Sequence, residues 1–387
     1  MTGAAALPLE GLRIVDLTTM VAGPYATLLL VDLGADVVKV EPPRGDQARD
    51  LGPRHSPGMG AVFVNCNRGK RSVVLDLTTD DGRDALKRLT ATAAGFVHNL
   101  RPDAAARCGA DAETLRAGHP ELVHCTIRGF GSGGRYRDLP AYDDIIQGAA
   151  GIAGQQEWVA GEPTYVATAI ADKVAGLTAA LAITAALHDR CATGHGSTVE
   201  VPMFESLVAF GLLEHLWGRT FVPPLGDARY PRVSSPERRP YATADGWISV
   251  VVYTNEHWRK FFDIIGRPEL MDDERYSTLW SRTQNITEVH RLVAESLLAR
   301  TTDEWLEQLH AAGIPTVRYS RVDDLFDDPH LTDAGLFEHV QHPTEGELLQ
   351  IATPVTFDGE KGRLDRPAPH LGEHTAEVLG ELGIAPD

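Results

Sequence analysis

The first two hundred residues alternate between short β-branched runs and longer helical patterns, which constrains the fold more than any other feature. Six runs have the composition of buried strands: Arg13–Leu17, Asp36–Val40, Ser72–Leu77, Ala94–His98, Leu122–Ile127 and Ser197–Val201. Helical patterns separate several of them, at Tyr25–Leu33, Asp80–Ala91, Asp111–Gly118 and Asp172–His188. Strand–helix alternation at this spacing is typical of βαβ units. It predicts an α/β, Rossmann-like domain with a parallel sheet that binds ligands beyond the carboxyl ends of its strands.

The pattern changes after residue 221, so we expect more than one domain. A large domain is predicted over 1–221, a linker rich in Pro and Arg over 222–240, and a smaller α+β domain over 241–312. The small domain is predicted to contain a strand and three helices: Trp247–Val252, Glu256–Ile265, Thr287–Leu298 and Thr302–Ala312. The segment 313–387 is irregular apart from a helix at His374–Leu382, and we expect it to return to the large domain.

Charge and composition narrow the class of partner. The 387 residues include 36 Lys and Arg against 54 Asp and Glu, a formal net charge of −18. A chain this acidic is not expected to bind nucleic acid or an anionic membrane as its main partner. The most apolar stretch, Ala167–Leu187, contains Asp172 and Lys173, which predicts a buried core helix rather than a membrane span. An anionic small ligand would need a local basic patch.

Cysteine and histidine spacing gives no metal signature. The four cysteines (Cys66, Cys108, Cys125 and Cys191) form no CxxC pair, which is typical of free thiols in a reducing cytosol. The fifteen histidines are scattered along the chain in no arrangement that suggests a metal site, so none is predicted. The first dozen residues lack a basic start and an apolar block, so we expect no secretion signal and a cytoplasmic protein.

Two basic clusters lie at or near turns between predicted strands and helices, where phosphates often bind. One is Asn67–Arg71 and the other comprises Arg101 and Arg107. Either cluster alone is typical of a solvated surface, but the two together favour a phosphate-rich ligand.

The segment Gly129–Gly134 matches the spacing of a dinucleotide-binding loop. The residues that follow it, Arg135–Ala141, are charged and include Pro140, which predicts a loop where that motif requires a helix. We therefore interpret the glycines as a turn where the backbone comes close to another group. The sequence has no GxSxG, HExxH or Walker motif.

Asp172 is the acidic residue at the start of the apolar helix. Its position alone favours a helix cap, whose carboxylate accepts a backbone N–H bond from the first turn. A catalytic carboxylate is compatible with that role, because the helix dipole favours the ionised form and free N–H groups can stabilise an oxyanion. The small side chains of Gly176, Ala175 and Ala179 are expected to leave room for a bulky thioester.

An ordered series of motifs over nearly the whole chain resembles the class III CoA-transferases, also called the CaiB–BaiF or formyl-CoA transferase family. The series comprises Leu9–Leu17, Ala22–Pro24, Leu33–Glu41, Arg44–Asp46, Asn67–Leu77, Gly129–Gly131, the Asp172 segment, Arg190, Thr193–Gly194, Gly196, Asp245–Trp247 and Pro367–His374.

The resemblance implies that Asp172 is a nucleophile that forms an aspartyl–acyl anhydride and then an aspartyl-CoA thioester. The implied CoA contacts are Met20, Val21, Leu75, Asn99, Leu100 and Arg107, with Tyr142 lining the site. CoA and acyl-CoA would be substrates, together with a carboxylic acid, and no tightly bound cofactor is implied. Family members are interlocked homodimers in which each chain is an open ring. In such a dimer Arg229, Arg232, Arg238 or Arg239 could anchor the acceptor carboxylate, or they could be solvated linker residues.

Two other functions remain open at this point. An acyl-CoA racemase of the same family needs a second acid–base residue, and those members resemble Gly-His-Asp where this chain has Ala141-Tyr142-Asp143. Tyrosine is a poor proton shuttle at neutral pH. A CoA-binding protein without turnover is the other possibility. Pro140 replaces a basic residue of some transferases, and the glycine-rich loop of the oxalate-using members is not evident. The sequence identifies neither acid.

Overall fold

The computed structural model describes residues 6–362 and 366–384. The chain forms two compact units. Unit 1 comprises Met1–Ala150, Ala167–Phe210 and Pro329–Asp387, and unit 2 comprises Gly151–Val166 and Gly211–Asp328. The units are described separately below.

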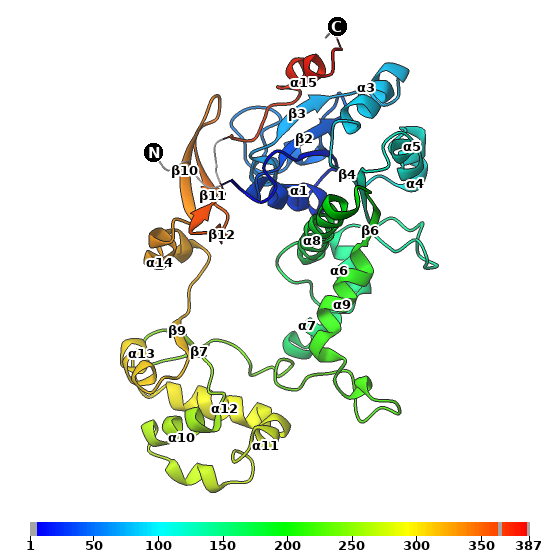
Figure 1. Ribbon diagram of the computed structural model, residues 1–387. Coiled ribbons are helices and arrows are strands. Elements are labelled where there is room, and N and C mark those ends of the chain that lie inside the picture. The colour runs from blue at the N-terminus through cyan, green and yellow to red at the C-terminus, as the bar shows by residue number, and fades with distance from the viewer. Residues whose placement is uncertain (1–5, 363–365, 385–387) are drawn as a thin grey trace. The chain divides into compact units, whose positions relative to one another are not determined.

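Unit 1 contains a six-stranded parallel sheet with the order β3-β2-β1-β4-β5-β6 (Figure 1). Its strands are β1 Arg13–Leu17, β2 Asp36–Glu41, β3 Arg71–Val74, β4 Gly95–His98, β5 Val123–Arg128 and β6 Thr198–Pro202. All six predicted strands are therefore present, and β1 has the predicted bounds. The chain moves outward in opposite directions from β1 and β4, so the position between these two strands is the topological switch point, where α/β sheets bind ligands.

Helices cover the sheet. Those of unit 1 are α1 Ala22–Asp32, α2 Ala61–Asn67, α3 Asp80–Thr90, α4 Pro102–Arg107, α5 Ala112–Ala117, α6 Asp143–Ala149, α8 Ile170–Thr193, α14 Pro329–Asp333 and α15 Thr375–Glu381, with the 3₁₀ segment η1 Gln47–Asp50. α9 Met203–His215 begins in unit 1 and ends in unit 2. The predicted α/β class is confirmed, although α2, α4, α6, α9 and α14 were not predicted. Apart from α9, these helices have only five to seven residues, too few to show a helical period.

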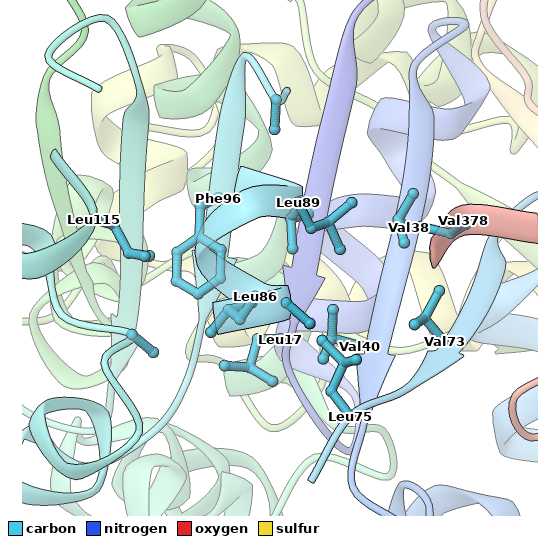
Figure 2. Packing of buried hydrophobic residues seen from close by; sticks show 14 of the residues in the cluster. Leu17, Val38, Val40, Val73, Leu75, Leu86, Leu89, Phe96, Leu115 and Val378 are labelled. Carbon is cyan, nitrogen blue, oxygen red and sulfur yellow. The ribbon is translucent and has the colours of Figure 1, made fainter. Parts of the chain in front are cut away.

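One core cluster of unit 1 lies on one face of the sheet. Alternate strand residues such as Leu17, Val38 and Val40 pack there against Leu86 of α3 and Val378 of α15 (Figure 2). Because side chains alternate along a strand, Asp16 and Lys39 lie on the opposite face, on which α1 packs.

The long apolar helix α8 packs beside α1 (Figure 1). Its length and composition would suffice to cross a membrane. The side chains that are fully buried within unit 1, including Ala171, Ala175, Ala179 and Ile183, are those expected of a core helix. The helix extends from Ile170 to Thr193, beyond the predicted bounds at both ends.

The C-terminal segment belongs to unit 1 and is joined to the sheet by polar contacts. Arg71 Nη1 donates to Glu377 Oε1 at 2.9 Å and to Glu381 Oε1 at 2.6 Å. The Gly69 N–H donates to the carbonyl of Arg366 at 2.8 Å. The remaining strands of this segment are β10 Phe337–His342, β11 Gly346–Ile351, β12 Thr356–Phe357 and β13 Glu360–Lys361, which form two antiparallel pairs.

Unit 2 is the smaller, α+β part. Its elements are α7 Ile152–Ala160, η2 Trp217–Thr220, β7 Tyr241–Ala242, β8 Trp247–Val250, α10 Asn255–Ile264, η3 Pro268–Asp272, α11 Leu279–Gln284, α12 Ile286–Leu297, α13 Thr302–Ala311, β9 Thr316–Arg318 and η4 Asp323–Asp327. An aromatic and aliphatic core that includes Trp258, Phe261 and Trp305 fills it.

The boundaries of unit 2 differ from the predicted ones in three places. Residues 222–240, predicted as a linker, lie within unit 2 because Arg229 bonds to Ser234 at 2.8 Å and covers the ring of Trp158. Residues 151–166, assigned to the large domain, belong to unit 2 as well. The predicted end at Ala312 is too early, because β9 pairs antiparallel with β8.

Candidate active site

A cavity of about 720 Å³ lies in unit 1 at the carboxyl ends of the strands. Its walls include the turn after β1, the turn after β4 and the loop after β5, so it occupies the topological switch point. Six of the predicted site residues line it: Met20, Leu75, Asn99, Leu100, Tyr142 and Asp172. Two do not line it. Val21 is the N-cap of α1, and Arg107 is an exposed residue at the end of α4.

Asp172 lies in the first turn of α8, but it does not cap the helix. The N-cap is Ala169, which makes no side-chain cap hydrogen bond, so the predicted cap at Asp172 is wrong. The Asp172 backbone N–H donates to Asp143 Oδ1 at 3.0 Å, and the Gln147 side-chain amide donates to Asp143 Oδ2 at 2.6 Å. Within the described residues, no hydrogen bond reaches the Asp172 carboxylate itself. Its oxygens are therefore available to a ligand in the cavity.

Burial, and then the nearby carboxylate of Asp143, raise the pKa of Asp172 to about 6. Both effects disfavour the charged form, since burial removes water and Asp143 adds a like charge. At neutral pH Asp172 is still mostly ionised, but its charge is poorly solvated. A poorly solvated carboxylate with free oxygens is suited to nucleophilic attack.

The small residues beside Asp172 have a different role from the predicted one. A Cβ at Gly176 would lie 2.8 Å from the Ala22 carbonyl oxygen and 2.8 Å from the Tyr25 ring. Ala175 and Ala179 are fully buried. These residues therefore allow α8 to approach α1 closely, and they do not leave space for a thioester.

Asn99, after β4, fixes the turn after β1. Its Oδ1 accepts the Thr19 N–H at 3.1 Å, and its Nδ2 donates to the Thr19 carbonyl at 3.0 Å. The side chain thus bridges the two strand ends that flank the switch point. In this geometry Asn99 shapes one wall of the cavity as well as lining it.

Four arginines supply positive charge to the cavity wall: Arg44, Arg101, Arg128 and Arg137. Arg128 pairs with Glu200 at 3.2 Å, and Arg137 pairs with Asp138 at 3.3 Å. Arg44 and Arg101 are exposed and make no ion pair within the described part of the chain. Of the four, only Arg101 was singled out for its charge in the sequence, although Arg44 lies in one of the family-like motifs. Arg128 and Arg137 flank the Gly129–Gly134 turn, so the glycine-rich motif is the sequence feature that could have identified them as site residues.

The basic cluster Asn67–Arg71 is structural, contrary to the predicted phosphate-binding role. Arg68 makes a bidentate pair with Asp32 at 2.6 and 3.0 Å. Lys70 donates to Asp16 at 3.1 Å, and both side chains are fully buried. Their positive charges are compensated inside the unit, so they are not available to a phosphate.

The glycine-rich segment after β5 is a turn of close backbone approach, as predicted. A Cβ at Gly129 would lie 2.3 Å from the Cβ of Ala141. The Gly131 N–H donates to the Glu205 carboxylate at 3.1 and 3.2 Å. The segment Arg135–Ala141 follows as irregular chain and forms part of the cavity wall.

Arg229, Arg232 and Arg239 have side-chain partners within unit 2. Arg229 bonds to Ser234, and Arg239 pairs with Glu237 at 3.0 Å. Arg232 lies over the ring of Tyr253 and lines a separate cavity of about 40 Å³.

One group of side chains in unit 1 has the composition of a metal site: His342, Glu345 and His370, whose ligand atoms lie within 4.8 Å of one another. Hydrogen bonds already engage both ring nitrogens of His342. Nε2 contacts the Ala368 carbonyl at 2.9 Å, and Nδ1 accepts from the Thr344 and Glu345 N–H groups at 3.2 Å. These bonds indicate a structural role for the cluster: it stabilises the turn between β10 and β11.

A family model, relatives in sequence and a solved structure all relate this chain to the CoA-transferases. The model of CoA-transferase family III matches residues 9–375. A succinate–glutarate CoA-transferase from Agrobacterium fabrum is 34% identical, covering 97% of this chain and 96% of its own. A succinyl-CoA:mesaconate CoA-transferase from Haloarcula hispanica is 35% identical with the same coverage of both chains. The crystal structure of a CAIB/BAIF family protein from Brucella suis superposes with a TM-score of 0.79 at 31% identity, covering 98% of this chain and 100% of its own.

Proposed function

Because the chain belongs to CoA-transferase family III, we propose that it transfers CoA from an acyl-CoA to a carboxylic acid through covalent intermediates on Asp172. The observation that carries the proposal is the Asp172 carboxylate at the switch-point cavity, with a raised pKa and with oxygens that make no hydrogen bond within the described residues.

The proposed reaction begins when an oxygen of Asp172 attacks the thioester carbon of the donor. The C–S bond breaks, CoA leaves as a thiolate, and an aspartyl–acyl anhydride forms. The thiolate then attacks the aspartyl carbonyl carbon, which releases the donor acid as a carboxylate and leaves an aspartyl-CoA thioester. The acceptor carboxylate attacks this thioester to give a second anhydride, and the thiolate attacks the acceptor acyl carbon to release Asp172. No net proton is exchanged, and each difficult step is divided into easier ones.

The cavity wall supports a polyanionic substrate. Arg44 and Arg101 are exposed at the wall without an ion pair in the described chain, so they suit the phosphates of CoA. Met20, Leu75 and Leu100 offer apolar contact to the pantetheine arm and the adenine. Arg107 lies at the end of α4, whose first residues Pro102 and Asp103 line the cavity, and we propose it as an outer phosphate contact.

For the acids we propose dicarboxylates, with succinyl-CoA as the donor to test first. Two relatives at 34% and 35% identity are named for succinate with glutarate and for succinyl-CoA with mesaconate. A human relative at 30% identity is named succinyl-CoA:glutarate CoA-transferase.

We also propose that the protein is a homodimer. In unit 2 the segment from residue 211 to 225 exposes several large apolar side chains, among them Leu213 at 86%, Val222 at 97% and Leu225 at 76%. Exposed apolar side chains gathered in this way are typical of interfaces. Sedimentation at several concentrations tests the proposal, and a monomer at all of them would contradict it.

The test of the mechanism is to trap the intermediate. After incubation with succinyl-CoA and then hydroxylamine, peptide mass spectrometry should find the modification on Asp172. Asp172→Asn should abolish CoA exchange and retain CoA binding. Asp144→Asn is the matched control, because Asp144 is exposed in α6 and does not line the cavity. An unmodified Asp172 across a broad acyl-CoA panel would refute the mechanism. Deuterium exchange at the α-carbon without an acceptor acid would instead indicate a racemase.

A further inference from the structure

Two buried charged side chains hold the turn that joins β1 to α1. Lys39 Nζ, on β2, donates to the Thr18 carbonyl at 2.8 Å. Asp46, which follows β2, accepts the Met20 N–H through Oδ1 at 3.1 Å. The same turn supplies Thr19 and Met20 to the cavity wall. Both charged residues therefore contact the turn that lines the cavity, although their own side chains do not line it.

Lys39 and Asp46 are paired with each other. Lys39 Nζ lies 2.9 Å from Asp46 Oδ2, and both side chains are fully buried. Burial opposes the charge of Lys39, but the surrounding carboxylates of Asp16, Asp46 and Glu41 outweigh it and raise its pKa. Lys39 is therefore protonated at neutral pH. Because the desolvation of two buried charges offsets much of their attraction, stability alone is a weak reason for this pair.

The backbone conformation of the turn supplies a stronger reason. Met20 has a φ of 70°, a left-handed conformation that residues other than glycine rarely adopt. Such a conformation persists only when the surrounding contacts determine it. The Lys39–Asp46 pair holds the residues on either side of Thr19, and Asn99 holds Thr19 itself.

We propose that the Lys39–Asp46 pair is a positioning device that fixes the β1–α1 turn in the conformation that binds the CoA portion of the substrate. The inference rests on the proposed function, since it takes CoA as the ligand of the cavity. It assigns no chemical step to either residue. Loss of the pair should therefore weaken CoA binding and leave the reactivity of Asp172 largely intact.

The experiment measures the Kd of CoA by isothermal titration, with KM and kcat for acyl-CoA in parallel. Asp46→Asn should raise the Kd and KM about tenfold, the effect of disturbing a charged hydrogen bond. The value of kcat at saturation should change less than about threefold. Lys39→Met should have a similar effect, and the double variant should be no worse than either single one, because the two side chains act as a unit. Asp46→Glu keeps the charge but displaces the oxygen that accepts from Met20, so it should also weaken binding even if Asp46→Asn does not fold.

The control is Asp32→Asn, which disturbs another buried ion pair of unit 1, that of Asp32 with Arg68. Neither residue lines the cavity, so Asp32→Asn should lower Tm without changing the Kd of CoA. Equal weakening by Asp32→Asn, or a Kd within twofold of wild type for Asp46→Asn and Asp46→Glu, overturns the inference. A wild-type protein that does not bind CoA would instead contradict the proposed function.

Discussion

The Asp143 carboxylate accepts a hydrogen bond from the backbone N–H of Asp172 at 3.0 Å, so two carboxylates meet where α6 and α8 begin. This contact fixes the start of α8 relative to α6. It also keeps a second negative charge beside the proposed nucleophile, which contributes to the raised pKa of Asp172. The arrangement has consequences for the pH dependence of the enzyme and for its stability.

The decrease of kcat/KM at low pH (the acid limb of the pH–rate profile) should report the pKa of Asp172. Only the ionised carboxylate attacks a thioester, so kcat/KM should decrease as the pH falls below about 6. That pH is well above the ordinary aspartate pKa of 3.8. Asp143→Asn preserves an oxygen for the Asp172 N–H but removes the like charge. It should move the limb to lower pH, while burial keeps it above the ordinary aspartate range. A pH–rate profile of both proteins checks this, and an unmoved limb in the variant would contradict it.

Replacing the nucleophile should stabilise the protein at neutral pH. A carboxylate whose pKa is raised on folding costs stability at neutral pH. The cost begins to shrink as pH falls through about 6 and is gone only below the unfolded value of 3.8. The shift corresponds to at most about 3 kcal/mol, and partial exposure reduces it to about 1–2 kcal/mol. Asp172→Asn should therefore raise Tm by a few degrees at pH 7.5, and the gain should shrink at pH 5. Thermal melts at both pH values measure it; an equal Tm for both proteins at pH 7.5 would be inconsistent with the buried charge.

Charge at the cavity wall should appear as salt-dependent binding of CoA. Arg101 is exposed at the wall without an ion pair in the described chain, so a phosphate can approach it directly. Arg101→Ala should weaken CoA binding by about tenfold and reduce its dependence on salt. Arg88→Ala is a suitable control, because Arg88 lies on α3 outside the cavity lining. Titrations at two salt concentrations would contradict the assignment if both variants bound CoA as wild type does.

The elements that set the site were predictable because their signals are local. The β-branched runs predict the parallel strands, and a parallel sheet places the turns after β1 and β4 side by side. Met20, Asn99 and Asp172 are far apart in sequence, but the fold brings them to one cavity as the motif series implied.

The partners of the charged residues were not predictable in the same way. Arg71 ends a basic run that suggests a phosphate site, yet it pairs with Asp36 of β2 and with Glu377 and Glu381, about three hundred residues later. A composition pattern contains no information on such a distant partner. The role of Gly176 was missed for a related reason, since space beside a glycine depends on which helix packs there.

Gly176 also gives a test of the packing that places Asp172. A Cβ at this position would lie 2.8 Å from the Ala22 carbonyl oxygen, and backbone cannot give way as a flexible side chain can. Gly176→Ala should therefore destabilise unit 1 by about 1–3 kcal/mol, despite the better helix propensity of alanine. Gly380 lies in α15 with nothing within 4 Å of a Cβ, so Gly380→Ala should be neutral or stabilise by up to about 1 kcal/mol. Urea unfolding of the two variants checks the contrast. If Gly176→Ala were as stable as Gly380→Ala, α8 could not pack on α1 as closely as the structure requires.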